Sequence, residues 1–205
     1  MGKIDLKKDL AELYPARKSA MKPHLVDVPE ALFIMIDGAG DPNRSARFQE
    51  ATSALYAIAY AAKFACKEAG SDFAVMPLEG LWWGDSPEVF TLDKKNKWKW
   101  TLMIRQPDVV TERMLDHMIG HAEESGKIGS VQAADVRVER FAEGKAAQVL
   151  HLGPYDEEGP VIKALHQFAR DQGLSLRGKH HEIYLGDPRR SAPEKLKTVL
   201  RQPVG

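Results

Sequence analysis

The chain has 205 residues, of which 43% are hydrophobic and 28% charged, so it is long enough to bury a core without disulfides or metals. Its 29 Lys and Arg residues balance its 29 Asp and Glu residues, which argues against electrostatic attraction to nucleic acid or to an anionic membrane. The single cysteine, Cys66, excludes an internal disulfide, and the first residues lack the apolar run of a secretory signal, so we expect a cytoplasmic protein.

In chain order, residues 1–22 are expected to form a helical extension, because Leu6, Leu10 and Leu13 recur at helical spacing. Residues 23–205 are expected to form one domain of two repeats, at about 23–108 and 132–205. The repeats are joined by a helix near 111–126 that Thr111 caps.

The repeats are inferred from landmarks that recur in the same order. The matched segments are VDVPEALFIMIDG (26–38) with RFAEGKAAQVLHLG (140–153), LEGLWWGD (78–85) with HEIYLGD (181–187), and WTLMIRQP (100–107) with LKTVLRQP (196–203). Each set predicts two strands joined by a tight turn as a hairpin, then a helix, a strand and a last strand.

The main helix of each repeat has its own boundary signals. The first is expected to begin at Asn43 or Ser45 and to end near Gly70, and the second has Pro160 in its first turn and Gly173 after its end. Two such repeats predict an α+β fold, in which one antiparallel-rich sheet carries both main helices on one face and a ligand cleft lies between the helices.

Aromatic residues gather in the first repeat. On the helix at 44–70, Tyr56, Tyr60 and Phe64 form a stripe beside a narrower stripe of small apolar residues. The strand at 98–105 alternates, so Trp98 and Trp100 should face the helices while Lys99, Thr101, Met103 and Arg105 form a wet face. Trp82 and Trp83 are adjacent, so one of them should face the helices. The pattern suits either a large aromatic core or a stacking platform for a flat ligand.

A polar strand in the second repeat complements these rings. His180, Glu182 and Tyr184 share one face of the strand at 180–187. A carboxylate in an apolar neighbourhood is costly unless it is partnered or functional, and the alternative is an ion pair of Glu182 with Arg177 or Lys179. Glu79 lies at the corresponding place in the first repeat, one residue out of register. His151, which precedes Gly153-Pro154-Tyr155, is typical of a structural histidine.

No metal or cofactor is expected. His117 and His121 are four residues apart on the joining helix, but no glutamate follows His117, so the zinc-protease signature is absent.

Five segments together resemble one known family. They are LVDVPEALFIMIDGAGDPN, VMPLEGLWWGD, KWKWTLMIRQPD, AAQVLHLGPYDEEGP and RGKHHEIYLGDPRRSAPEKLKTVLRQPV. They are similar to the GyrI-like (gyrase-inhibitor-like) small-molecule-binding proteins over residues 24–204, which implies a tandem strand–helix–strand–strand fold. The PLEGLWW and HHEIYLGDPRR segments further resemble a stand-alone subfamily, the cyclopropanoid cyclopropyl hydrolases.

The resemblance implies a cleft for planar aromatic xenobiotics, in which Glu182 matches a buried glutamate that attracts cationic drugs. In the subfamily an aromatic cage holds a DNA-alkylating natural product whose cyclopropane is fused to a dienone. Glu182 and Tyr184 are then the expected catalytic residues, and Tyr184 or Tyr60 the expected donor to the carbonyl oxygen. The expected ligand-binding residues are Tyr56, Tyr60, Phe64, Trp82, Trp83, Trp98, Trp100, His151 and Tyr155.

Three functions remain open from the sequence. The first is a detoxifying hydrolase that protects the cell from such alkylators. The second is a protein that sequesters flat hydrophobic or cationic compounds without turnover. The third is a regulatory partner of a DNA-acting enzyme, although the balanced charge argues against direct contact with nucleic acid. The expected partner is a small planar ligand, with no membrane partner; the oligomeric state is not given by the sequence.

Overall fold

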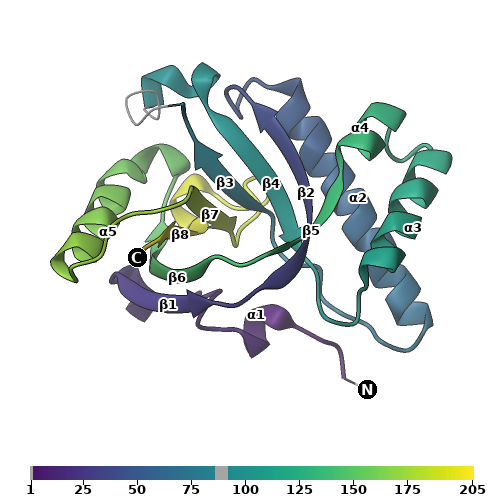
Figure 1. Cartoon of the computed structure of the whole chain (residues 1–205), viewed down its shortest axis with the longest axis horizontal. Helices are drawn as coiled ribbons and strands as arrows, with labels where there is room; N and C mark the ends of the chain where they lie inside the picture. Colours follow the sequence, from purple (N-terminus) through teal and green to yellow (C-terminus); the bar gives the residue numbers. More distant parts are fainter. Residues whose placement is uncertain (1, 86–91) are drawn as a thin grey trace.

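The computed structural model describes residues 2–85 and 92–205, and within them eight strands form one curled antiparallel sheet (Figure 1). The order of the strands across the sheet is β1-β6-β8-β7-β3-β4-β2-β5. Their bounds are β1 (His24–Val28), β2 (Ala31–Ala39), β3 (Glu79–Trp83), β4 (Lys99–Arg105), β5 (Arg137–Phe141), β6 (Gly144–Leu152), β7 (His180–Tyr184) and β8 (Lys197–Pro203). The α+β fold predicted from the sequence is confirmed.

The first strand of each repeat pairs with the other repeat, so the predicted hairpins are wrong. β1 pairs with β6, and β5 pairs with β2. A two-residue hairpin turn needs positive φ, usually at glycine or asparagine, whereas β1 and β2 are separated only by Pro29 and Glu30, and neither adopts it. The chain therefore crosses over, and each half of the sheet is completed by a strand from the other half. β3 and β7 meet at the centre of the sheet.

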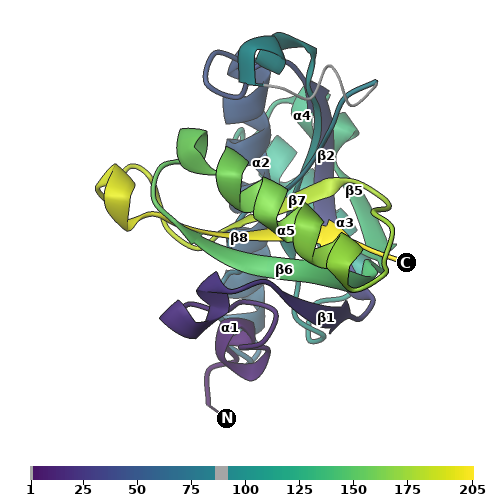
Figure 2. The same ribbon diagram turned by 90° about the vertical axis from the view of Figure 1, so that its left-hand side faces the viewer.

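The two main helices cover the same face of the sheet. α2 (Ala46–Glu68) packs on β2 and β4, and α5 (Gly159–Asp171) lies across β6 and β8 (Figure 2). Of the two candidate caps, Ser45 is the one observed, since its hydroxyl accepts a hydrogen bond from the Phe48 amide at 3.2 Å. Gly70 and Gly173 follow the two helices with positive φ, as their positions predict.

Shorter helices surround this core. The joining helix α3 packs on α2, and Thr111 caps it by accepting from the Met114 amide at 3.2 Å. The expected N-terminal helix is confined to one turn of α-helix and a later 3-10 turn. The remaining bounds are α1 (Leu6–Asp9), α3 (Glu112–Glu124), α4 (Ser130–Asp135), and the 3-10 helices η1 (Lys18–Met21), η3 (Leu92–Lys97), η4 (Tyr155–Glu157) and η5 (Pro193–Lys195). Among the described residues, no helix has the length and apolarity to cross a bilayer.

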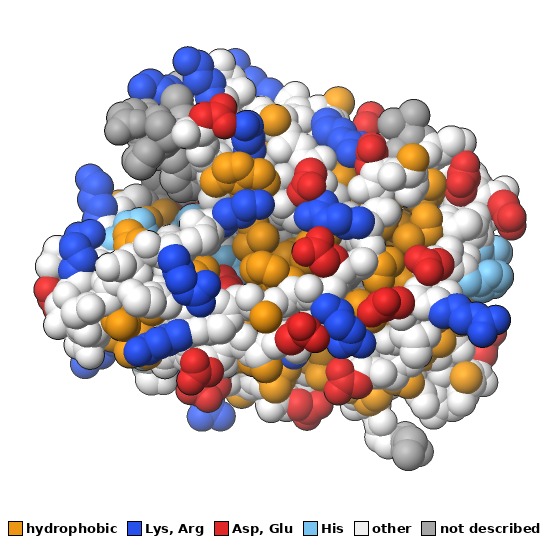
Figure 3. All heavy atoms as spheres, viewed as in Figure 1, with side chains coloured by type: hydrophobic (Ala, Val, Ile, Leu, Met, Phe, Trp, Pro, Cys, Tyr) orange, Lys and Arg blue, Asp and Glu red, His pale blue; other side chains and the backbone are white. Residues whose placement is uncertain are grey.

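Both faces of the sheet are buried near β4, which corrects the expectation of a wet face. Thr101 and Met103 are fully buried, and Met103 packs in a small cluster with Phe33 and Leu81. The reason is the curl of the sheet, which brings neighbouring strands over this face. Side chains of both charges are interspersed on the surface in Figure 3, and that face carries no stripe of a single sign.

A polar centre lies buried on the face of the sheet opposite the two main helices. Glu79, Glu143, His181 and Arg201 meet there, each almost fully buried, and Tyr14 closes the group from the N-terminal segment. We call these five residues the buried charge network. The Tyr14 hydroxyl donates to Glu79 at 3.0 Å, so the network also ties down the chain that precedes β1.

Candidate functional site

The candidate site lies where β3 and β7 pair, on the face between α2 and α5. In this register Gly80 is opposite Glu182, and Trp82 is opposite His180. A Cβ atom on Gly80 would lie 2.7 Å from Trp82 Nε1 and 3.1 Å from the Tyr184 hydroxyl oxygen. Gly80 therefore provides the space in which the side chains of the two strands meet.

A chain of hydrogen bonds ends on Glu182. Trp82 Nε1 donates to the Tyr184 hydroxyl at 3.0 Å, and that hydroxyl donates to Glu182 Oε2 at 2.8 Å. His180 Nε2 lies 3.4 Å from the other carboxylate oxygen. Burial, and then the charge of Glu182, raise the pKa of Tyr184 well above its ordinary value, so the phenol keeps its proton.

The alternative partners of Glu182 are engaged elsewhere. Arg177 donates to the carbonyl oxygens of Glu143 and Val204, and the Lys179 ammonium lies 3.4 Å from the centre of the Trp83 ring. Neither forms an ion pair with Glu182 among the described contacts. The carboxylate instead accepts a hydrogen bond from a phenol, and an imidazole lies beside it.

Glu158, which no pattern in the sequence distinguishes, also lies close enough to Glu182 to feel its charge. It precedes α5, its side chain is only 3% exposed, and burial followed by the charge of Glu182 raises its pKa to about 9. In the sequence, Glu157 and Glu158 both resemble acidic residues that favour a helix N-terminus, so nothing local distinguishes them. Only the folded chain brings Glu158 close to Glu182.

Aromatic rings surround the two carboxyl groups. Phe48 stacks on Trp82 with 5.9 Å between ring centres, and Trp98 meets Trp82 edge-on at 5.7 Å. Tyr155 meets Tyr184 edge-on at 5.6 Å. Burial, with the nearby carboxyl groups of Glu158 and Glu182, raises the pKa of Tyr155 to about 12.

The stripe on α2 leads away from this centre. Tyr56 is half-buried, whereas Tyr60 and Phe64 are 46% and 54% exposed, and successive ring centres are 6.3 Å apart. Burial raises the pKa of Tyr56, and Asp187 contributes to the rise, so the loop after β7 lies near this ring. The stripe offers a row of rings that begins at the site and continues to the surface.

Other expected ligand-binding residues lie apart from the site. Trp100 is fully buried beside Phe48, and its ring fills the space above Gly38. Trp83 points to the opposite face, where it packs with Leu81 and Met103. Of the adjacent pair, it is therefore Trp82 that faces the helices.

His151 lies on the same face of the sheet as Tyr184, with Thr198 between them in the strand register. It is buried, and its Nε2 lies 3.1 Å from the Pro154 carbonyl oxygen, so it supports the turn that carries Tyr155. No group of three or more His, Cys, Asp or Glu side chains within the described parts of the chain is placed to hold a metal ion.

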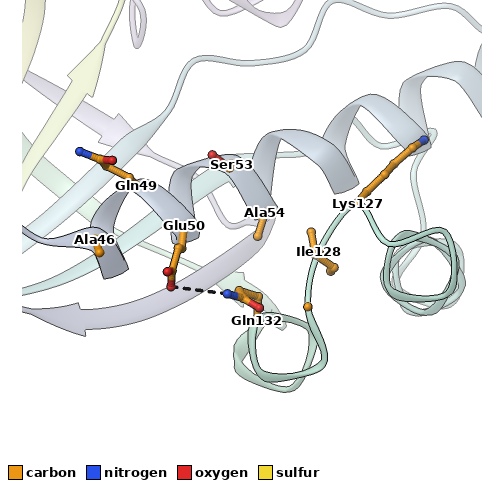
Figure 4. A pocket seen from close by; sticks show the side chains of 9 residues that line it. Ala46, Gln49, Glu50, Ser53, Ala54, Lys127, Ile128 and Gln132 are labelled. Atoms are coloured by element: carbon orange, nitrogen blue, oxygen red, sulfur yellow. Dashed lines mark hydrogen bonds between the residues drawn. The ribbon is translucent and has the colours of Figure 1, made fainter.

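A cavity of about 330 Å³ lies elsewhere, between α2 and α4 (Figure 4). Gln132 Nε2 donates across it to Glu50 Oε2 at 3.4 Å. Its lining contains no aromatic ring, and Ser53, Lys127 and Ile128 are among the residues around it. It lacks the rings and buried acids of the sheet centre, so we assign the candidate site to the face of β3 and β7.

Comparison with known proteins gives one family and several similar structures. The family model of the GyrI-like small molecule binding domain matches residues 21–204. An uncharacterized conserved protein from Listeria innocua is 41% identical with a TM-score of 0.89, covering 99% of this chain and 100% of that one. A structure named as a hydrolase from Listeria innocua is 40% identical with a TM-score of 0.84, with the same coverage. The EcmrR C-terminal domain shares the fold at 14% identity and a TM-score of 0.60, covering 90% of this chain and 97% of that domain. No curated protein matches the chain.

Proposed function

This chain belongs to the GyrI-like family of small-molecule-binding domains, and we propose that it adds water to flat aromatic compounds that carry a strained, electrophilic ring. The observation that carries the proposal is a carboxylate, Glu182, that is only 13% exposed and is held by a phenol among aromatic rings. A similar protein of 40% identity is named a hydrolase, which supports turnover as well as binding.

The proposed substrate class is a cyclopropane fused to a dienone, as in DNA-alkylating natural products. Glu182 takes a proton from a water molecule, whose oxygen attacks the least hindered ring carbon. The carbon–carbon bond of the cyclopropane breaks, and its electron pair moves through the dienone to the carbonyl oxygen, which becomes a phenolate. Protonation gives a phenol and an alcohol, and the alkylating carbon is consumed before it reaches DNA.

Each part of the site has a role in this reaction. The hydrogen bond from Tyr184 orients Glu182, and general base help of this kind contributes about 10²–10⁴-fold in rate. Trp98 and Tyr155 provide ring surfaces on which a flat molecule stacks, and the buried Trp82 supports them from behind. Tyr56 extends this surface along α2.

The test is incubation of the protein with a cyclopropane-bearing alkylator, followed by mass spectrometry. We expect a product heavier by one water, formed over many turnovers. Glu182→Gln should abolish turnover while ligand binding persists, and Glu157→Gln, at an exposed position nearby, serves as the matched control. Full activity of Glu182→Gln would refute the assignment of the base.

A second candidate function is sequestration of lipophilic cations without turnover. The observation that favours it is the same carboxylate, because one negative charge among rings attracts a flat cation. In that case protection is stoichiometric, no water-added product forms, and Glu182→Gln weakens binding of a cationic dye more than binding of a neutral flat analogue.

A further inference from the structure

We propose that Glu158 is the proton donor of this site and that Glu158 and Glu182 work as an acid–base pair holding one proton between them. The inference rests on the proposed function and deepens it, since it assigns the second half of the reaction to a named side chain.

The first support is the placement of Glu158. It occupies the N-cap position of α5, and its side chain accepts no hydrogen bond from the free amides of that helix. Its side chain is 3% exposed, and its Oε1 has no hydrogen-bond partner among the residues that the structure describes. The neighbouring Glu157 is exposed. Glu158 is thus a buried acid that the helix terminus does not use.

The second support is the set of charges around it. Burial disfavours the ionised form of Glu158, the charge of Glu182 disfavours it further, and together they raise its pKa to about 9. The Thr198 hydroxyl, and to a smaller extent the charge of Lys95, oppose this rise without cancelling it. The titratable groups that face Glu158 are Glu182 and Tyr184 on β7, Tyr155 and Asp156 on η4, and Lys95 on η3. At neutral pH, Glu158 therefore carries a proton.

The third support is that the proton donors expected from the sequence, Tyr184 and Tyr60, are either already hydrogen-bonded or exposed on the surface. The one hydroxyl proton of Tyr184 lies in its bond to Glu182, and the same oxygen accepts from Trp82. Tyr60 is 46% exposed on α2. A buried, protonated carboxyl group is better placed to give a proton to a carbonyl oxygen in the site.

The proton balance is simple. Glu182 accepts the proton that water loses as the carbon–oxygen bond forms. Glu158 gives its proton to the dienone oxygen, which receives the electron pair of the broken carbon–carbon bond. The pair then holds one proton on Glu182 and none on Glu158, and return of that proton to Glu158 restores the starting state.

Glu158→Gln tests the role, because glutamine keeps the shape and a donor but cannot transfer a proton. We expect turnover to fall about 100-fold, within the usual range for general acid catalysis, while binding of the alkylator changes less than twofold. Wild-type activity should be lost as pH rises through about 9, and Glu158→Gln should lack this loss. Glu157→Gln should match the wild type in both rate and pH profile.

A readout without turnover separates this inference from the proposed function. Infrared spectra of wild-type protein with isotope-labelled glutamate should show a protonated carboxyl band at pH 7 that disappears as pH rises through about 9. The band should be missing in Glu158→Gln at pH 7. If the wild type turns over but Glu158→Gln keeps its rate and pH profile, Glu158 is not the donor and the hydrolase remains. If the band is present but no alkylator is hydrolysed, the shared proton stands and the proposed reaction fails.

Discussion

The substitution Glu143→Gln tests how the buried charge network holds the sheet. Glu143 Oε2 lies 3.0 Å from Arg201 Nη1 and 3.0 Å from His181 Nδ1. Burial alone would raise the pKa of this carboxyl, but the charges of His181 and Arg201 outweigh it and hold the pKa at about 2. Because the folded pKa is lower than the ordinary 4.5, the stabilisation is present above pH 4.5 and is lost as pH falls through 2.

The expected magnitude follows from that difference. A fall of the pKa from 4.5 to about 2 corresponds to about 3 kcal/mol of unfolding free energy. Removing one partner of a buried ion pair costs about 3–5 kcal/mol, because the other charge stays buried. We therefore expect Glu143→Gln to lower the unfolding free energy at pH 6 by about 3 kcal/mol and the melting temperature by about 6–12 °C.

Urea unfolding followed by tryptophan fluorescence measures this change. Glu139→Gln, on the exposed surface of β5, is the control, and its unfolding free energy should change by no more than about 0.5 kcal/mol.

The pH dependence of the unfolding free energy gives a second readout. Burial lowers the pKa of His181, but the charges of Glu143 and Glu79 outweigh it and raise the pKa to about 9. That stabilisation is complete below pH 6.5 and is lost as pH rises through about 9, and in Glu143→Gln the loss should be complete at a lower pH because the folded pKa of His181 is raised less. The reasoning would be refuted if Glu143→Gln lowered the unfolding free energy by less than about 1 kcal/mol and lost stability at the same high pH as the wild type.

Two further substitutions test the packing and the site. Gly38→Ala should lower the free energy of unfolding by about 1–3 kcal/mol, because the added Cβ would overlap the buried Trp100 ring. The control is Gly120→Ala within α3, where an added Cβ meets no other atom, and it should be neutral or stabilising in the same thermal melt. Trp82→Phe keeps a ring but removes the donor to Tyr184, so we expect turnover or ligand affinity to fall about tenfold, as loss of one hydrogen bond of about 1.4 kcal/mol implies. Trp83→Phe, on the opposite face, should leave turnover unchanged, and equal losses in both variants would show that the Trp82 hydrogen bond is not used.

Local signals in the sequence were enough to predict the helices and the class of the fold. The Ser45 and Thr111 caps, and glycines after the main helices, are signals within a few residues of the structure they specify. The exchange of β1 and β5 between the repeats could not be predicted from local signals, because an apolar strand can pair with either of two similar strands. The one local signal against a hairpin is the Pro29-Glu30 link, which lacks the glycine or asparagine of a two-residue hairpin turn.

The site was predictable to the extent that strand alternation fixes it. Alternation puts Glu182 and Tyr184 on one face and assigns Trp100 to the helix side, and the structure agrees with both orientations. Alternation cannot distinguish a ring that contacts a ligand from a ring that fills the core. Trp100 fills the core because Gly38 has no side chain and leaves room for the indole ring. Glu158 could not be found in this way, because its approach to Glu182 depends on how α5 docks on the sheet.

The two polar centres of the molecule depend on one strand. His181 points into the buried charge network, and its neighbour Glu182 points to the candidate site. A slip of one residue in β7 would exchange these two side chains, leaving Glu182 beside Glu79 and Glu143, which like-charge repulsion and burial make very costly. The buried charge network therefore also fixes the register of β7 against β3. This register keeps Glu182 opposite Gly80, where the missing side chain leaves room for Trp82 and Tyr184.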